Sequence, residues 1–104
     1  MSLKTREMVF VALADPSRRL LLDRLRLRNG QTLSELCEGQ TISRQAVTKH
    51  LTILEEANLV TSEKRGRERL HFLNPVPIHA VAMRWLRQFD ELPLDTLAKS
   101  EGPG

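Results

Sequence analysis

Four side chains able to bind a base edge or a phosphate stand close together in the middle of the chain. They are Arg44, Gln45, Thr48 and Lys49, and they directly follow Ser43, a residue type that commonly caps the start of a helix. Residues four apart lie one above the other on a helix, which stacks Thr48 on Arg44 and Lys49 on Gln45. These two neighbouring rows would occupy one side of the helix. Their hydrogen-bonding groups are of the kinds that read base edges in a DNA groove. The free N–H groups beside Ser43 would also suit a phosphate.

A second basic group surrounds Gly66 further along the chain. Glycine supplies the positive φ that a tight turn between two extended runs usually needs. A cationic tip of this kind can reach the DNA backbone or a neighbouring minor groove, although Glu63 and Glu68 dilute its charge. We therefore expect a modest contact from four side chains: Lys64, Arg65, Arg67 and Arg69.

The first group requires a helix, which is predicted over residues 43–57. Its apolar residues follow the spacing of a buried stripe, and the candidate DNA-binding side chains lie opposite this stripe. The last turn carries two glutamates that DNA would repel, so the N-terminal half is expected to enter the major groove. The stripe is Val47, Leu51 and Leu54, and the glutamates are Glu55 and Glu56.

The remaining elements are predicted from capping residues and apolar spacing. Asp15 before Pro16 is a helix-start signal, and Thr32 with Glu35 forms a capping box. Asn58 is expected to end the preceding helix in a left-handed conformation. We expect helices over residues 3–14 and 16–28, a short helix from Thr32 that ends at Gly39, the helix over 43–57, strands over 59–64 and 69–73, and a last helix over 78–92.

Length and composition limit the number of domains, the fold class and the cellular compartment that we expect. The 104 residues suit one domain, expected over residues 1–92, followed by a flexible tail over 93–104. Apolar residues make up 40% and aromatic residues 4%, which favours a mainly helical fold with a small hairpin. The net charge of +3 is compatible with a nucleic-acid partner. A single cysteine and the absence of a long apolar run favour a cytoplasmic protein with no membrane partner.

The order helix, helix, short helix, turn, helix, hairpin, helix is that of a winged helix-turn-helix domain. The segment TLSELCEGQTISRQAVTKHLTILEEANLVTSEKRGRERLHFLNP, residues 32–75, resembles the ArsR/SmtB family of bacterial repressors, as does ADPSRRLLLDRL, residues 14–25. The resemblance implies a dimer that represses promoters and releases DNA on binding an effector. It also implies that Arg44, Gln45, Thr48 and Lys49 face the groove.

The metal sites familiar from this family are not expected here. Arsenic-sensing members carry a Cys-x-Cys pair after a Glu-Leu, whereas this chain has only Cys37, which is expected as a small buried apolar residue. Zinc-sensing members pair histidines and carboxylates on the last helix, which here offers His79 without a second histidine. His50 and His71 are expected in the DNA-facing half. No metal and no cofactor is therefore predicted.

The first and last helices carry more apolar surface than one small domain can readily cover. Pairing with a second copy would bury it, although the two helices could also cover each other within one chain. The residues expected at a dimer interface are Val9, Phe10, Leu13, Ile78, Val81, Trp85, Leu86 and Phe89.

The sequence thus predicts a DNA-binding transcriptional regulator, a homodimeric repressor released from a palindromic operator by an unknown small-molecule or protein effector. An enzyme is disfavoured, because no nucleophile motif or phosphate-binding glycine loop is present. Two alternatives stay open, a metal-responsive repressor and a winged-helix protein-interaction module that does not bind DNA.

Overall fold

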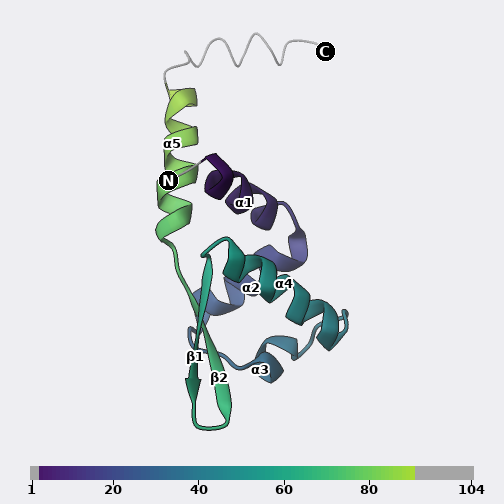
Figure 1. The fold of residues 1–104 in the computed structure, drawn as a ribbon. Coiled ribbons are helices and arrows are strands. Elements are labelled where there is room, and N and C mark those ends of the chain that lie inside the picture. Colours follow the sequence, from purple (N-terminus) through teal and green to yellow (C-terminus); the bar gives the residue numbers. More distant parts are fainter. Residues whose placement is uncertain (1–2, 91–104) are drawn as a thin grey trace.

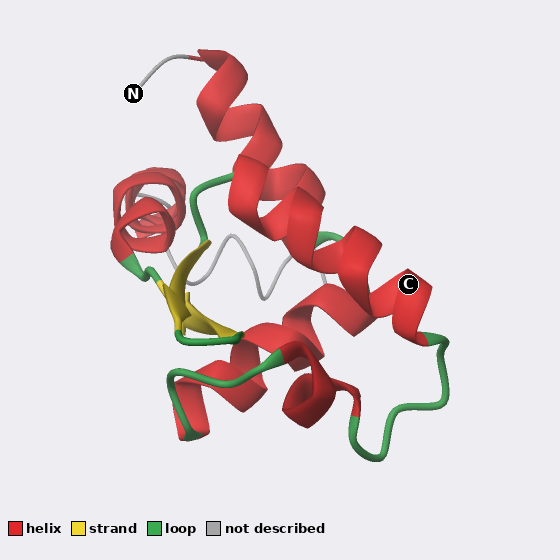
Figure 2. Cartoon of the chain, turned by 60° about the horizontal axis from the view of Figure 1, so that its bottom comes forward, coloured by secondary structure: helices red, strands yellow, loops and turns green. Residues whose placement is uncertain are grey.

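The computed structural model describes residues 3–90. These residues form helices with a single antiparallel hairpin, in the order that the sequence predicts (Figures 1 and 2). Helices α1 and α5 lie side by side at one end of the molecule, and α3 and the hairpin lie at the other (Figure 1). The elements are α1 Leu3–Leu13, α2 Pro16–Leu27, α3 Leu33–Cys37, α4 Arg44–Glu56, β1 Val60–Arg65, β2 Glu68–Leu73 and α5 Val76–Asp90.

The helix starts follow the predicted capping residues. Asp15 accepts from the N–H groups of Ser17 and Arg18, and Ser43 Oγ accepts from the N–H of Ala46. Thr32 and Glu35 form the complete capping box. Each cap satisfies N–H groups that a helix start leaves without a partner. The local sequence therefore determines where α2, α3 and α4 begin.

The end of the segment after α4 was predicted correctly, whereas the start of α5 was not. Asn58 has φ +61° and ends the segment after α4, as expected. Helix α5 begins at Val76, earlier than predicted, because Asn74 Oδ1 accepts from the N–H of Val76. Pro77 lies in the first turn of α5, where its missing N–H costs no helical hydrogen bond. The predicted tail over 93–104 lies outside the described residues.

The core lies between α2 and α4, which supply more of its side chains than any other helix or strand, and is completed by α1, α3 and the hairpin. It consists almost entirely of aliphatic side chains, which pack without leaving polar atoms to satisfy. Cys37 is half-buried and packs against this core as a small apolar residue. The largest fully buried side chains are Leu21, Leu25, Leu36, Leu54, Leu59, Val9, Val47 and Val60.

The hairpin is fixed to the helical body through a buried polar junction. The backbones of Gln31 and His71 pair as an isolated bridge, and His71 Nδ1 lies 3.0 Å from the carbonyl oxygen of Gln31. Gln31 Nε2 in turn donates to the carbonyls of Arg24 and Arg28 at the end of α2. The His71 side chain is therefore buried at this junction, where the hairpin meets the helices.

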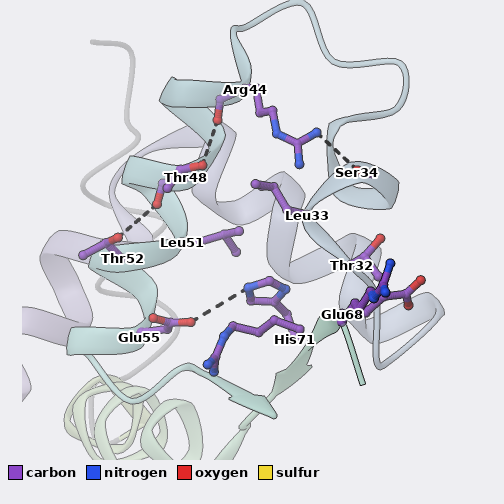
Figure 3. Close-up of a pocket in the computed structure, with 12 residues that line it drawn as sticks. Thr32, Leu33, Ser34, Arg44, Thr48, Leu51, Thr52, Glu55, Glu68 and His71 are labelled. Atoms are coloured by element: carbon purple, nitrogen blue, oxygen red, sulfur yellow. Dashed lines mark hydrogen bonds and ion pairs between the residues drawn. The ribbon is translucent and has the colours of Figure 1, made fainter. Parts of the chain in front are cut away.

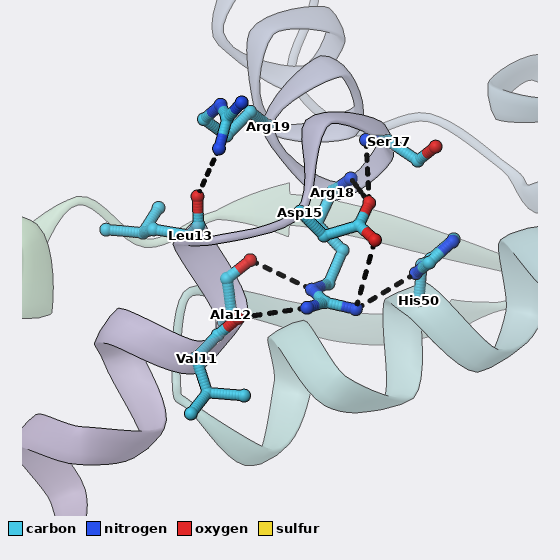
Figure 4. A network of polar contacts seen from close by, with 8 residues as sticks. All are labelled: Val11, Ala12, Leu13, Asp15, Ser17, Arg18, Arg19 and His50. Carbon is cyan, nitrogen blue, oxygen red and sulfur yellow. Dashed lines mark hydrogen bonds and ion pairs between the residues drawn. The ribbon is translucent and has the colours of Figure 1, made fainter.

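Arg18 joins three helices at the corner between α1 and α2 (Figure 4). Its guanidinium donates to the carbonyls of Val11 and Ala12, which end α1, at 2.9 Å each. Nη1 of the same group lies 3.2 Å from His50 Nδ1 on α4. A guanidinium can only donate, so the His50 nitrogen accepts. His50 thus belongs to a contact between α4 and the α1–α2 corner.

Candidate nucleic-acid interface

The outer face of α4 carries all the side chains expected to read DNA. Val47, Leu51 and Leu54 are buried, as the spacing predicts, and the opposite face is open to solvent. A helix whose apolar stripe is held by the core must present its remaining positions outward. The exposed positions of the first three turns include Ser43, Arg44, Gln45, Thr48, Lys49 and Thr52.

A groove of about 500 Å³ runs between α4, α3 and the hairpin (Figure 3). Cations stand along it at Arg44, Arg67 and Arg69, and the two carboxylates are Glu55 and Glu68. The structure therefore brings Arg44 and Thr48 together with part of the hairpin, while Gln45 and Lys49 lie outside this lining. The residues around the groove are Thr32, Leu33, Ser34, Arg44, Thr48, Leu51, Thr52, Glu55, Arg67, Glu68, Arg69 and His71.

Several side chains along the groove already make hydrogen bonds within the chain. Arg44 Nη1 donates to Ser34 Oγ on α3 at 3.2 Å. The hydroxyl of Thr48 donates to the carbonyl of Arg44 at 3.0 Å, and that of Thr52 donates to the carbonyl of Thr48 at 3.1 Å. These contacts restrain the side chains in one arrangement, which lowers the entropy lost on binding a ligand.

The helical period also predicts Thr52 on the exposed face of α4, one turn after Thr48, although it was not among the candidate DNA-binding residues. No role for Ser34 was predicted from the sequence. Ser34 lies on α3, and its contact with Arg44 depends on how α3 crosses α4. No local sequence signal specifies that crossing.

The part of the groove near the end of α4 carries a carboxylate, that of Glu55. Glu55 Oε1 lies 4.0 Å from His71 Nε2, and the Glu55 carboxylate stands at the end of α4 nearest the hairpin (Figure 3). A carboxylate there repels a phosphate that would approach this end of α4. The charge along α4 is therefore graded, with donors at its start and acceptors at its end, as the sequence predicts.

The four hairpin cations do not form one cluster. Lys64 pairs with Arg69 across the hairpin, in the same alternation as Ser62 and His71, whereas Arg65 stands one residue out of step with them. Arg69 donates to Ser62 Oγ at 2.9 Å and lines the groove. Arg65 instead pairs with Glu63 at 3.2 Å, and its guanidinium carbon lies 5.7 Å from the centre of the Phe72 ring. The hairpin therefore offers its cations unequally to the groove.

Helices α1 and α5 expose a cluster of large apolar side chains far from the groove. Phe10 meets the Trp85 ring edge-on, and Trp85 meets Phe89 in the same way at 4.8 Å between ring centres. Trp85 and Phe89 are each about half exposed, at 48% and 50%, and Leu86 is similar. We call Phe10, Trp85, Leu86 and Phe89 the aromatic face.

Four other residues expected at a dimer interface have different positions. Val9 and Val81 are 0% and 2% exposed and are covered within the single chain, so they offer no surface to a partner. Leu13 and Ile78 are half-buried against the core. The two helices thus cover each other along one side and leave the aromatic face open on another.

Within residues 3–90 no group of three or more histidine, cysteine or acidic side chains comes close enough together to hold a metal ion. His79 is exposed on α5, and Cys37 stands apart on α3. Over the same residues, none of the helices has both the length and the apolar character that spanning a membrane demands.

Comparison with known proteins gives three results. Residues 13–63 match the family model described as a helix-turn-helix domain. The chain is 40% identical to the uncharacterized HTH-type transcriptional regulator YuzN of Bacillus subtilis, over 78% of this chain and 95% of the relative. It is 30% identical to the transcriptional repressor SdpR of the same organism, over 78% and 88%.

The structural comparison agrees with the sequence comparison. The chain resembles an ArsR-like transcriptional regulator from Rhodococcus sp. RHA1 with a TM-score of 0.73 and 32% identity. The likeness covers 93% of this chain and 89% of the other. The similarity therefore extends over the hairpin and both terminal helices as well as the helix-turn-helix.

Proposed function

This protein belongs to the ArsR family of winged helix-turn-helix transcriptional regulators, and from that premise we propose that it is a homodimeric repressor of a palindromic operator. The family membership itself indicates a DNA-binding regulator and not an enzyme. Repression is proposed because a relative of 30% identity is named a transcriptional repressor. Such a protein would act in the cytoplasm, where a bacterial operator lies.

One observation carries the DNA-binding part of the proposal. The exposed face of α4 concentrates donors in its first turns and lies beside a groove whose other wall is the hairpin. We propose that Ser43, Arg44, Gln45, Thr48 and Lys49 enter the major groove. The hairpin cations Lys64, Arg67 and Arg69 would contact the backbone, and Arg65 would contribute less because its guanidinium pairs with Glu63.

The dimer is proposed from the aromatic face. Burying one large apolar side chain is worth about 1.5 to 3 kcal/mol, so four such side chains left half exposed favour a covering partner. A second copy is the simplest partner, since a two-fold axis brings the same face of both chains together. Two copies of α4 would then lie about 34 Å apart and read two halves of a palindrome.

The effector of this repressor would be a small molecule or another protein. Its binding would release DNA only if it favours a dimer whose two α4 helices no longer match the operator spacing. Arg18 connects α1, which carries Phe10, to α4 through His50, so a rearrangement at the aromatic face has a physical route to α4.

The decisive experiment removes the two donors at the start of α4. The operator is first selected from random duplexes with the wild-type protein. In Arg44→Ala/Gln45→Ala, specific affinity in a gel-shift assay should fall about thirtyfold or more, because removing a side chain that binds a base costs about 1 to 3 kcal/mol. The dimer should persist in sedimentation analysis.

A matched control is Arg26→Ala, which removes one cation from an exposed position on α2, where it pairs with Asp23. Its operator affinity should stay within about twofold of wild type, because a surface charge away from the DNA is largely screened. Unchanged operator affinity in the double variant would refute the placement of α4 in the groove.

A further inference from the structure

The two threonines of the outer α4 face have their hydroxyl hydrogens committed. Thr48 Oγ1 donates to the carbonyl of Arg44 and Thr52 Oγ1 to the carbonyl of Thr48, at 3.0 and 3.1 Å. A threonine hydroxyl carries one hydrogen. Neither side chain can therefore donate to a base without first breaking a bond within its own helix.

What remains available on Thr48 is its methyl group and the lone pairs of its oxygen. Base edges in the major groove differ in what they offer such a side chain. Guanine presents two acceptors, for which a donor is needed. Thymine presents a methyl group, which suits an apolar contact with the threonine methyl. The oxygen lone pairs could still accept from the amino group of adenine or cytosine, but only thymine offers a partner to the threonine methyl. The bonded hydroxyl thus disfavours guanine, and the methyl group favours thymine.

The surroundings of Thr48 support an apolar contact. Leu33 and Leu51 line the same groove, and Leu33 comes from α3 across from Thr48 (Figure 3). Arg44, one turn earlier on the same side, is held by Ser34 on α3. The Arg44 guanidinium is therefore held towards α3. The part of the groove beside Thr48 is lined by leucine side chains as well as by this cation.

We propose that Thr48 determines part of the operator sequence by contacting the methyl group of a thymine in each half-site. This inference rests on the proposed function, because it requires that the outer face of α4 enters the major groove. Thr48 is favoured over Thr52 because it lies in the half of α4 that carries Arg44, Gln45 and Lys49. Thr52 lies closer to Glu55, which repels the DNA backbone.

The experiment replaces thymines by deoxyuridine, which removes the methyl group and keeps every hydrogen-bonding atom. Each thymine of the selected operator is replaced in turn, in both half-sites, and affinity is measured by fluorescence anisotropy. Wild-type protein should lose about threefold to fivefold in affinity for each methyl contact, and so about tenfold or more when both half-sites are changed.

Three variants then assign the contact to one side chain. Thr48→Ser keeps the hydroxyl and lacks the methyl, so its affinity should not distinguish thymine from deoxyuridine at the sensitive position. Thr48→Val keeps the methyl and lacks the hydroxyl, so it should stay sensitive. Thr61→Ser makes the same chemical change on an exposed strand position outside the groove lining and should behave as wild type. Thermal melting confirms that each variant is folded.

Several outcomes would overturn the inference. Affinity that responds to deoxyuridine at no position would remove the methyl contact. A loss of specific binding in Thr48→Val as severe as in Arg44→Ala/Gln45→Ala would mean that the hydroxyl, and not the methyl group, makes the essential contact with DNA. Sensitivity that survives in Thr48→Ser and vanishes in Thr52→Ser would assign the contact to Thr52. Failure of the proposed function itself looks different, since no preferred duplex would be selected at all.

Discussion

The groove side of α4 and the aromatic face of α1 and α5 are both exposed, and they are built in opposite ways. On the groove side, Arg44 is held by Ser34, Arg69 by Ser62, and Thr48 by a carbonyl of its own helix. On the aromatic face, Trp85 contacts Phe10 and Phe89 but remains 48% exposed. The first surface is already arranged within one chain, whereas the second is only partly covered.

The difference indicates two kinds of binding. Polar side chains that are restrained before binding lose little entropy when a partner arrives, and their directional hydrogen bonds suit a partner of matching geometry. Large apolar side chains left in water provide a strong, non-directional driving force for association. We therefore expect substitutions on the aromatic face to alter assembly, and substitutions on the groove side to alter DNA binding alone.

The largest effect is expected from Trp85→Ala. The substitution removes the central ring of the aromatic face from both copies, and truncation of a buried interface aromatic costs about 2 kcal/mol or more. The dimer dissociation constant should rise about a hundredfold or more, as measured by analytical ultracentrifugation. Operator binding should weaken with it, because each half-site would be held separately.

Leu27→Ala is the matched control, since Leu27 is a well-exposed leucine on α2, away from the aromatic face. It should leave the dimer intact. A Trp85→Ala protein that sediments as a dimer at the same concentrations as wild type would show that the partner copy binds elsewhere.

Substitutions in the hairpin should have the next largest effect. They test whether Arg67 and Arg69, which line the groove, contribute more to DNA binding than Arg65 does. Arg67→Ala/Arg69→Ala should weaken binding to all duplexes, and the slope of log affinity against log salt should fall by about 0.9 for each phosphate that is no longer neutralised. Arg65→Ala should change the slope much less, because Glu63 already pairs with that guanidinium. Equal slopes for these two proteins would contradict the division of the hairpin into unequal faces.

The smallest effect is expected at Asp15, between the two regions. Partial burial raises the pKa of its carboxyl, but hydrogen bonds from the N–H groups of Arg18 and Ser17 and the charge of Arg18 outweigh this, so the pKa lies below its ordinary value of 3.8. The ionised carboxylate therefore contributes stability above the ordinary pKa, and this stability is lost as pH falls through the lowered value.

Asp15→Asn should remove this contribution to the pH dependence. Urea unfolding of both proteins between pH 2 and 6 measures it: the stability difference should shrink as the pH falls below about 4. A difference that stays constant across this range would mean that the carboxylate charge adds nothing. Dimerisation and DNA binding near neutral pH should be similar in the two proteins, since neither surface contains Asp15.

Features that depend on neighbouring residues could be predicted from the sequence. The caps at Asp15, Thr32 and Ser43 each join atoms no more than three residues apart, and the left-handed Asn58 follows directly from its place after α4. The buried stripe of α4 follows from the helical period, and so does the exposed face opposite to it. The order of elements, the winged helix-turn-helix fold and the candidate DNA-binding helix follow from these local rules.

Contacts between elements were decided by the tertiary structure. Arg44 meets Ser34, Arg18 meets His50, and His71 meets Gln31, although these partners are 10, 32 and 40 positions apart. Val9 is buried while its neighbour Phe10 is exposed, because only packing decides which side of an apolar helix meets α5. Periodicity gives the direction of a side chain around its own helix. Which neighbour occupies that direction depends on how the elements pack together, and no local signal carries that information.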